Sequence, residues 1–222
     1  MPNFTESVAA ILSVLDVAED RDEGLGPPPG TFESVAAAYL AQWGEVRAVA
    51  QAIEALRDEG WLEPEALAAA DEAAVADAWR EAGARGLLKL IPTLQRLARW
   101  AAPSLRAGAS TESLRDGLRG VKGVGAASAD AILLRGIGRV AYPVDRATYR
   151  IVVRHGWLDP SAGYDEARSL VEAALPDDPT GLASLSAGFE QVGRLWCRAS
   201  VAKCERCPLR PLLPEGGPLG ES

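Results

Sequence analysis

Apolar side chains recur at helical spacing through most of this 222-residue chain. In residues 45–59, for example, Val46, Val49, Ile53 and Leu56 lie three or four positions apart and so share one face of a helix. The alternation of apolar and polar residues that is typical of strands is scarce, which predicts an all-α fold. The pattern predicts helices over residues 3–20, 31–42, 45–59, 63–70, 72–83, 86–102, 111–118, 126–134, 146–155, 165–174 and 183–196.

Glycine and proline mark the breaks between these helices. The run from Gly24 to Gly30 holds three consecutive prolines and predicts a linker. The tail from Pro208 is rich in Pro, Leu and Gly, which predicts an irregular C-terminal segment. No internal repeat of fixed period is present.

The composition is that of an ordinary globular protein, with 48% hydrophobic and 24% charged residues. No apolar run reaches the ~18 residues that a membrane helix needs. The first ten residues lack the basic flank and the apolar core of a signal peptide. We therefore expect a cytoplasmic monomer without a membrane partner.

Charge is spread unevenly along the chain. The net charge of −8 argues, taken whole, against binding to nucleic acid. Residues 1–118 hold 10 Lys and Arg against 19 Asp and Glu, a balance of −9, whereas residues 119–157 hold seven against two, a balance of +5. Charges farther apart than a Debye length of ~8–10 Å are screened, so a basic face on an acidic body can still bind phosphate. A solvated helix face with scattered arginines is the alternative interpretation.

A glycine-containing turn, Val121–Gly125, lies between two predicted helices. Glycines adopt backbone angles that are closed to other residues, so successive N–H groups can turn toward one point and bind an anion. Lys122 adds a positive charge at the tip, and the contact would involve the backbone of Gly123, Val124 and Gly125. The alternative is an ordinary corner between two helices, in which the glycines only reverse the chain.

The segment Leu118–Gly125, the following Ser128–Leu133 and the pair Val144-Asp145 resemble the helix–hairpin–helix–Gly/Pro–Asp signature of the endonuclease III superfamily of DNA glycosylases. The resemblance extends to Gly193–Cys197 and covers residues 30–210. It implies two helical lobes with a DNA-binding groove between them. One lobe would span residues 29–140 and carry the hairpin. The other would combine residues 1–28 with 141–222 and carry a C-terminal cysteine loop.

The resemblance assigns Asp145 as the catalytic carboxylate, which would stabilise the oxocarbenium-like transition state of N-glycosidic bond cleavage. Its position before a helix also suits a plain N-cap, and the two roles can coexist. Gln42 and Arg85 match the family's residues that enter the duplex. Bifunctional members carry a lysine two residues after the second hairpin glycine, where this chain has Ala127. The lyase route should therefore be absent. The amino-acid sequence around the hairpin and Asp145 is similar to that of the monofunctional 3-methyladenine glycosylase branch.

Three cysteines, Cys197, Cys204 and Cys207, have the spacing of the family's [4Fe–4S] cluster ligands. The fourth ligand position is Leu213, and the chain has no other cysteine. Three thiolates can still hold a cubane cluster, because each binds a different iron. An empty site, a zinc site and a disulfide are the alternatives, of which zinc fits poorly without a fourth ligand. Arg198 and Lys203 in the same loop are candidate phosphate contacts.

Trp43, Trp61, Trp79 and Trp100 lie in the first helical block and are predicted to belong to the core. His155 is predicted to end its helix. The sequence favours a monofunctional glycosylase acting on double-stranded DNA that contains damaged bases or abasic sites. A catalytically weak protein of the same fold that only binds such DNA is the main alternative, and a purely structural helical protein is a third.

Overall fold

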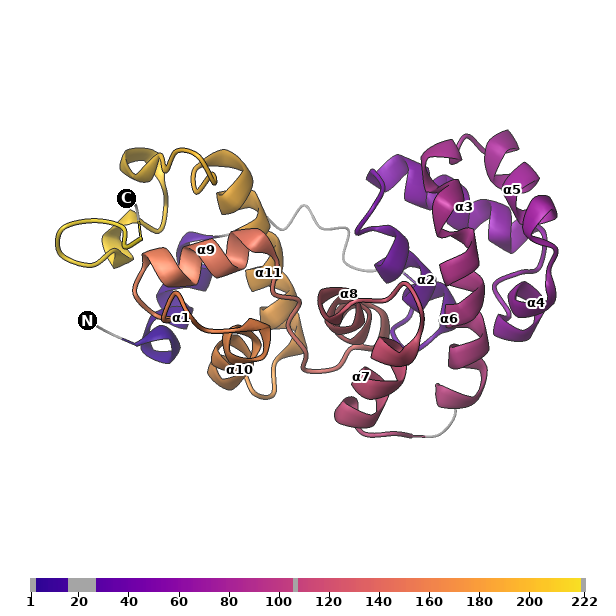
Figure 1. The fold of residues 1–222 in the computed structure, drawn as a ribbon, viewed down its shortest axis with the longest axis horizontal. Coiled ribbons are helices and arrows are strands. Elements are labelled where there is room, and N and C mark those ends of the chain that lie inside the picture. Colours follow the sequence, from indigo (N-terminus) through magenta and orange to yellow (C-terminus); the bar gives the residue numbers. More distant parts are fainter. Residues whose placement is uncertain (1–2, 16–26, 106–107, 221–222) are drawn as a thin grey trace. The chain divides into compact units, whose positions relative to one another are not determined.

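The computed structural model describes residues 3–15, 27–105 and 108–220, and these residues form helices, turns and loops with no strand. The all-α prediction is confirmed. The chain divides into two compact units, which we call the central unit (residues 24–139) and the terminal unit (residues 1–23 with 140–222) (Figure 1). No helix within the described ranges is both long and apolar enough to span a membrane.

The central unit is a bundle of short helices around α6, which packs against α2 and α4 (Figure 1). Fully buried Trp79, Tyr39, Leu40 and Leu94 contribute to its core. Its elements are α2 (Phe32–Leu40), α3 (Val46–Asp58), α4 (Pro64–Ala69), α5 (Glu72–Glu81), the 3₁₀ helix η1 (Arg85–Leu90), α6 (Ile91–Ser104), α7 (Thr111–Gly120), α8 (Ala126–Ala131) and the π-helix η2 (Ile132–Ile137).

The helices α2 and η2 pack closely against each other in the central unit, and Gly136 permits this approach. A Cβ at Gly136 would lie 3.0 Å from Cα of Val35 and 3.1 Å from the carbonyl oxygen of Ser34. The Ser34 hydroxyl and the Gly30 N–H both donate to the Gly136 carbonyl, at 2.6 and 2.8 Å. This contact fixes α2 against the helix that follows the hairpin.

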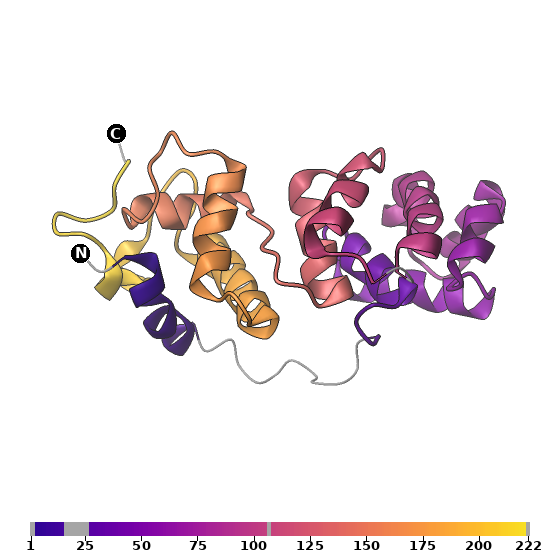
Figure 2. The same ribbon diagram turned by 90° about the horizontal axis from the view of Figure 1, so that it is seen from below.

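The terminal unit joins the two ends of the chain. α1 packs against α10 and α11, and α9 packs against α11 (Figure 2). Its core includes Phe4, Ile11, Tyr142 and Phe189, and the Phe4 ring meets Trp157 edge-on at 5.4 Å. Its elements are α1 (Phe4–Val14), α9 (Arg146–Arg154), α10 (Tyr164–Ala174), α11 (Pro179–Leu195) and the 3₁₀ turns η3 (Cys204–Arg206) and η4 (Arg210–Leu212).

Helix boundaries differ from the prediction mainly where proline lies inside the first turn. The helix expected over 86–102 is divided at Ile91, because Pro92 has no N–H and suits the start of a new helix. The helix expected from residue 183 begins at Pro179, where Asp178 accepts from the Gly181 N–H at 2.7 Å. In the helix expected over 3–20, residues 16–20 lie outside the described part of the chain.

Candidate functional site

The hairpin is a tight turn between α7 and α8. The N–H groups of Val121 and Val124 close successive turns on the carbonyls of Leu118 and Val121, at 3.0 Å each. Gly123 has φ +100, a left-handed conformation that favours glycine. Lys122 is exposed, whereas the Val124 side chain is buried and anchors the loop.

The N-terminus of α8 has no side-chain cap. Its N-cap residue is Gly125, which has no side chain to accept from the first N–H groups of the helix. Ala127 lies in the first turn of α8 and is half-buried. The two hairpin helices are held together by a buried ion pair, in which Nε of Arg115 donates to Asp130 at 2.7 Å. The sequence predicted the glycine turn with Lys122 at its tip, but it contained no indication of the ion pair between Arg115 and Asp130.

Asp145 is the N-cap of α9 in the terminal unit. Its Oδ1 accepts from the Thr148 N–H at 2.6 Å, so the predicted cap is present. Thr148 is buried and its hydroxyl shares a hydrogen bond with the Tyr142 hydroxyl at 3.2 Å. The carboxylate itself is exposed. The cap therefore fixes the orientation of an acid that solvent or a ligand can reach.

An open cavity of about 430 Å³ borders Asp145. Tyr149 and Tyr164 form its walls together with Val144, and Arg146 and Arg150 add positive charge. The Tyr149 hydroxyl donates to the carbonyls of Pro160 and Ala162, at 2.7 and 3.0 Å, which fixes that ring. The surroundings of the acid thus combine two aromatic rings with two guanidinium groups.

Gln42 and Arg85 lie on adjacent turns of the central unit. Gln42 follows α2, and its Nε2 donates back to the Ala38 carbonyl at 3.0 Å. Arg85 is exposed at the start of η1. The two turns are in contact, because a Cβ at Gly44 would lie 2.7 Å from Cδ2 of Leu87.

The expectation that Trp43 belongs to the core is wrong. Trp79 is fully buried, but 53% of Trp43 is exposed. α2 ends at Leu40, so Trp43 lies in the turn beyond the helix. An exposed indole next to Gln42 is therefore a feature that helical periodicity missed.

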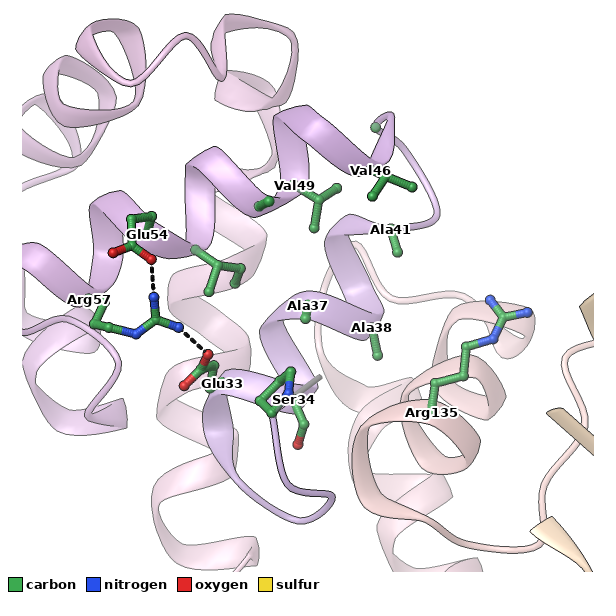
Figure 3. Close-up of a pocket in the computed structure, with 14 residues that line it drawn as sticks. Glu33, Ser34, Ala37, Ala38, Ala41, Val46, Val49, Glu54, Arg57 and Arg135 are labelled. Atoms are coloured by element: carbon green, nitrogen blue, oxygen red, sulfur yellow. Dashed lines mark hydrogen bonds and ion pairs between the residues drawn. The ribbon is translucent and has the colours of Figure 1, made fainter. Parts of the chain in front are cut away.

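A groove of about 640 Å³ runs between α2 and α3 (Figure 3). Alanine and valine side chains form much of its lining. Because they are short and aliphatic, the groove is wide and mainly apolar. Arg57 closes one end, where it pairs with Glu33 and Glu54, and the carboxylate of Glu33 raises the Arg57 pKa. The lining from α2 and α3 includes Ala37, Ala38, Ala41, Val46, Val49, Ala50 and Ile53.

The three cysteines border one cavity in the terminal unit, together with Leu213 and Pro218. Burial raises the pKa of the Cys207 thiol, while backbone N–H groups of Leu209 and Arg210 lower it. The Arg154 guanidinium donates to Sγ of Cys197 at 3.3 Å. Within the described ranges, no three His, Cys, Asp or Glu side chains are grouped to hold a single metal ion.

Three thiols that border one cavity, one of them with a hydrogen bond from Arg154, are the kind of donor set that could hold three corners of a cubane cluster. Such a cluster needs thiolates spread over different irons, with hydrogen bonds to the sulfurs, and a single-ion geometry is not required. Leu213 lines the same cavity but has no donor atom for a fourth corner. His155 also lines the cavity. As predicted it ends α9, where it stacks on Trp157 at 4.5 Å, and burial lowers its pKa.

The cysteine loop is attached to the helix that Asp145 begins. Arg150 donates twice to the Cys197 carbonyl, at 3.0 and 3.2 Å, and Arg154 donates to the Arg198 carbonyl at 2.9 Å. The side chains of Arg198 and Lys203 are exposed on the loop. The sequence did not single out Arg150 and Arg154 for this role, although their four-residue spacing places them on one face of α9.

The helical units, the glycine hairpin and the capped aspartate together define a protein with the endonuclease III fold. An endonuclease III–DNA covalent intermediate has a TM-score of 0.66 to this chain at 20% identity, over 97% of this chain and 98% of its own. The 3-methyladenine DNA glycosylase MagIII of H. pylori, bound to 1,N6-ethenoadenine, has a TM-score of 0.64 at 19% identity, over 87% of this chain and 98% of its own.

Sequence similarity is more limited. A Methanocaldococcus jannaschii protein that carries the name of a DNA repair glycosylase is 34% identical over 97 residues. The matched segment spans less than half of either protein, 44% of this chain and 44% of the relative. No family model matches the chain. The resemblance to the endonuclease III superfamily is confirmed by these comparisons.

Proposed function

We propose that the protein is a monofunctional DNA glycosylase, which extrudes a damaged base from duplex DNA and hydrolyses its N-glycosidic bond. The observation that carries this proposal is the exposed, cap-oriented carboxylate of Asp145 beside a tyrosine-walled cavity. It occurs in a chain that also contains the uncapped hairpin, with the endonuclease III fold as its framework.

Asp145 acts on the sugar. As the bond from the anomeric carbon to the base nitrogen breaks, positive charge develops on the ring, and a fixed carboxylate stabilises it. Water then forms the new bond to that carbon, and its proton leaves with the base. The Thr148 N–H keeps one carboxylate oxygen in place, so little reorganisation is needed during the reaction.

The hairpin binds a DNA phosphate through the backbone at Gly123, Val124 and Gly125, with Lys122 adding charge. Arg198 and Lys203 on the cysteine loop make further phosphate contacts. These contacts fix position and read no sequence. Gln42 and Arg85, which lie on adjacent turns, enter the duplex and replace the extruded nucleotide.

The groove between α2 and α3 holds the extruded base. Ala41 and Gly44, which flank Gln42 and Trp43, both line it, so a base displaced by that turn lies next to an apolar space large enough to accept it. Most of the lining is aliphatic, with the Arg57 ion pairs and Arg135 at its edges, so flat heteroaromatic rings would be bound mainly by burial of apolar surface.

Ala127 has no amine, so no Schiff base can form at this position and strand cleavage is not expected. A [4Fe–4S] cluster would be held by Cys197, Cys204 and Cys207. When bound, it would act as a rigid anchor for the loop that carries Arg198 and Lys203. Arg150 and Arg154 attach that loop to α9.

A strand-nicking assay on a panel of damaged duplexes, with and without hot alkali, tests the proposal. We expect nicks that require alkali and that disappear in Asp145→Asn. Asparagine also caps helices, so this variant should fold normally. Asp178→Asn makes the same change at the N-cap of α11 in the same unit, and it should retain activity.

Two results would contradict the proposal. Cleavage without alkali that is trapped by borohydride would show a lyase and overturn the role of Ala127. Tight binding to abasic duplex with no alkali-sensitive product on any substrate of the panel would favour a protein that binds damage without turnover.

A further inference from the structure

A chain of polar contacts crosses the central unit from α2 to the hairpin. The buried Tyr39 hydroxyl on α2 is hydrogen-bonded to the Thr93 hydroxyl on α6. One turn along α6, Nη1 of Arg96 lies 3.4 Å from Oγ1 of Thr93 and donates to the carbonyl of Lys122 at 3.1 Å. Lys122 is the tip of the hairpin, so this chain ends on the peptide group that links Lys122 to Gly123.

That peptide group also lies against Thr93 of α6. A Cβ at Gly123 would lie 2.5 Å from Oγ1 of Thr93, so the backbone of the hairpin rests directly on this buried hydroxyl. Any side chain at position 123 would lift the turn away from α6. The glycine therefore serves close packing as well as its positive φ.

We propose that Arg96 is a positioning residue for phosphate binding by the hairpin, an inference that rests on the proposed function. The peptide bond is trans, so the C=O of Lys122 and the N–H of Gly123 point in opposite directions. When Arg96 holds the oxygen against α6, the N–H of Gly123 is turned away from α6, to the side where a ligand can approach.

The guanidinium also improves the donor electrostatically. A carbonyl oxygen beside an anion site would repel phosphate, and a bond from Arg96 offsets that partial charge. A cation bound to the oxygen polarises the whole peptide group, which strengthens its N–H as a donor. Arg96 therefore acts on the phosphate through the Lys122–Gly123 peptide, with no requirement for a contact of its own.

The salt dependence of DNA binding separates this role from a direct contact. The logarithm of affinity falls with the logarithm of salt concentration in proportion to the number of phosphates neutralised, by about 0.9 for each. Affinity for a duplex with an abasic-site analogue is measured over a series of salt concentrations. Lys122→Ala should reduce the slope by about one, as expected for a direct contact.

Arg96→Met keeps the length of the side chain and removes its donors. We expect it to weaken binding about tenfold, which is about 1.4 kcal/mol, at every salt concentration and with an unchanged slope, because a hydrogen bond from a charged donor is lost. Arg99→Met removes the same charge from the exposed face of α6 and should bind like the wild type. Arg96→Gln retains an N–H donor without charge and should recover part of the loss.

Three outcomes would overturn the inference while the protein still binds DNA. A slope reduced by about one in Arg96→Met would show a direct phosphate contact. Affinity equal to that of Arg99→Met would show that the hairpin needs no support. Unchanged hydrogen exchange at the Gly123 amide in Arg96→Met would show that the peptide does not depend on Arg96. Failure of the wild-type protein to bind any duplex would instead overturn the proposed function.

Discussion

At the scale of single residues, the candidate site depends on backbone groups whose direction is fixed by neighbours. Asp145 is oriented by one N–H of its own helix, and the hairpin is supported by Thr93 and Arg96 of α6. Each of these contacts is short-range, so single substitutions with matched controls can test them.

Gly123→Ala should lower the free energy of unfolding by about 2 kcal/mol, because alanine is strained at φ +100 and its Cβ would meet Thr93. Urea unfolding followed by circular dichroism measures this. Gly120→Ala, at the end of α7, is the control: nothing lies within 4 Å of its Cβ position, so it should be neutral or stabilising. Equal effects of the two substitutions would show that the hairpin does not impose this geometry.

Tyr39 predicts a loss of stability at high pH. Burial raises its pKa above 10.0 in the folded state. Both states keep the proton below pH ~10, but above it the unfolded chain loses the proton first, so the free energy of unfolding falls as pH rises toward the folded pKa. Tyr39→Phe lacks this loss, so the stability difference from wild type should shrink as the pH rises above about 10. If the free energies of unfolding of the two proteins changed in parallel with pH, the raised pKa of Tyr39 would be contradicted.

At the scale of elements, the helices of the described part were predictable from local periodicity, and most errors concern their ends. The helix expected from residue 183 begins at Pro179, because proline suits the first turn of a helix. The groove was not predictable, because Ala41 and Val49 come from two helices and no local pattern sets how those helices cross. The exposure of Trp43 was not predictable for the same reason, because it depends on how the neighbouring helices pack.

Ala41→Trp should fill the end of the groove nearest to Gln42. Ala41 is exposed, so we expect the fold to tolerate the larger side chain. Excision of bulky bases should fall at least tenfold, while binding to an abasic duplex, which needs no base pocket, should change less than twofold. Ala69→Trp, exposed on α4, is the control. Unchanged excision would exclude the groove as the base site.

The cysteine cavity predicts that a fourth thiol increases metal content. Leu213→Cys places a donor on the wall that now has none, so anaerobically reconstituted protein should retain more iron and sulfide and a stronger absorption near 400 nm. Leu212→Cys, whose side chain does not line the cavity, is the control. No iron in either variant, with none in the wild type, would show that the cavity holds no cluster.

At the scale of the whole molecule, DNA contacts are proposed on both units of a protein with net charge −8. The sequence located these cations by resemblance and by its basic segment. It contained no information on the hydrogen bonds by which Arg150 and Arg154 attach a distant loop to α9, because they join residues more than 40 positions apart.

Salt titration of the intact protein tests whether both units contact DNA. Three phosphate contacts, from Lys122, Arg198 and Lys203, predict a slope of roughly −2.7. Lys122→Ala should reduce its magnitude by about one, and the pair Arg198→Ala/Lys203→Ala by about two. A normal slope in the second pair would restrict DNA binding to the central unit.

The terminal unit also constrains the order in which the protein can mature. Its α1 comes before the central unit in the chain, yet the helices that bury Phe4 and Ile11 are encoded from residue 140 onward. At 5–20 residues per second, α1 leaves the ribosome roughly 10–40 s before α11 and the cysteine loop are complete. The central unit is contiguous and can fold during that interval. α1 therefore buries its apolar face only after α10 and α11 have been synthesised, so a product truncated before α10 would leave Phe4 and Ile11 exposed.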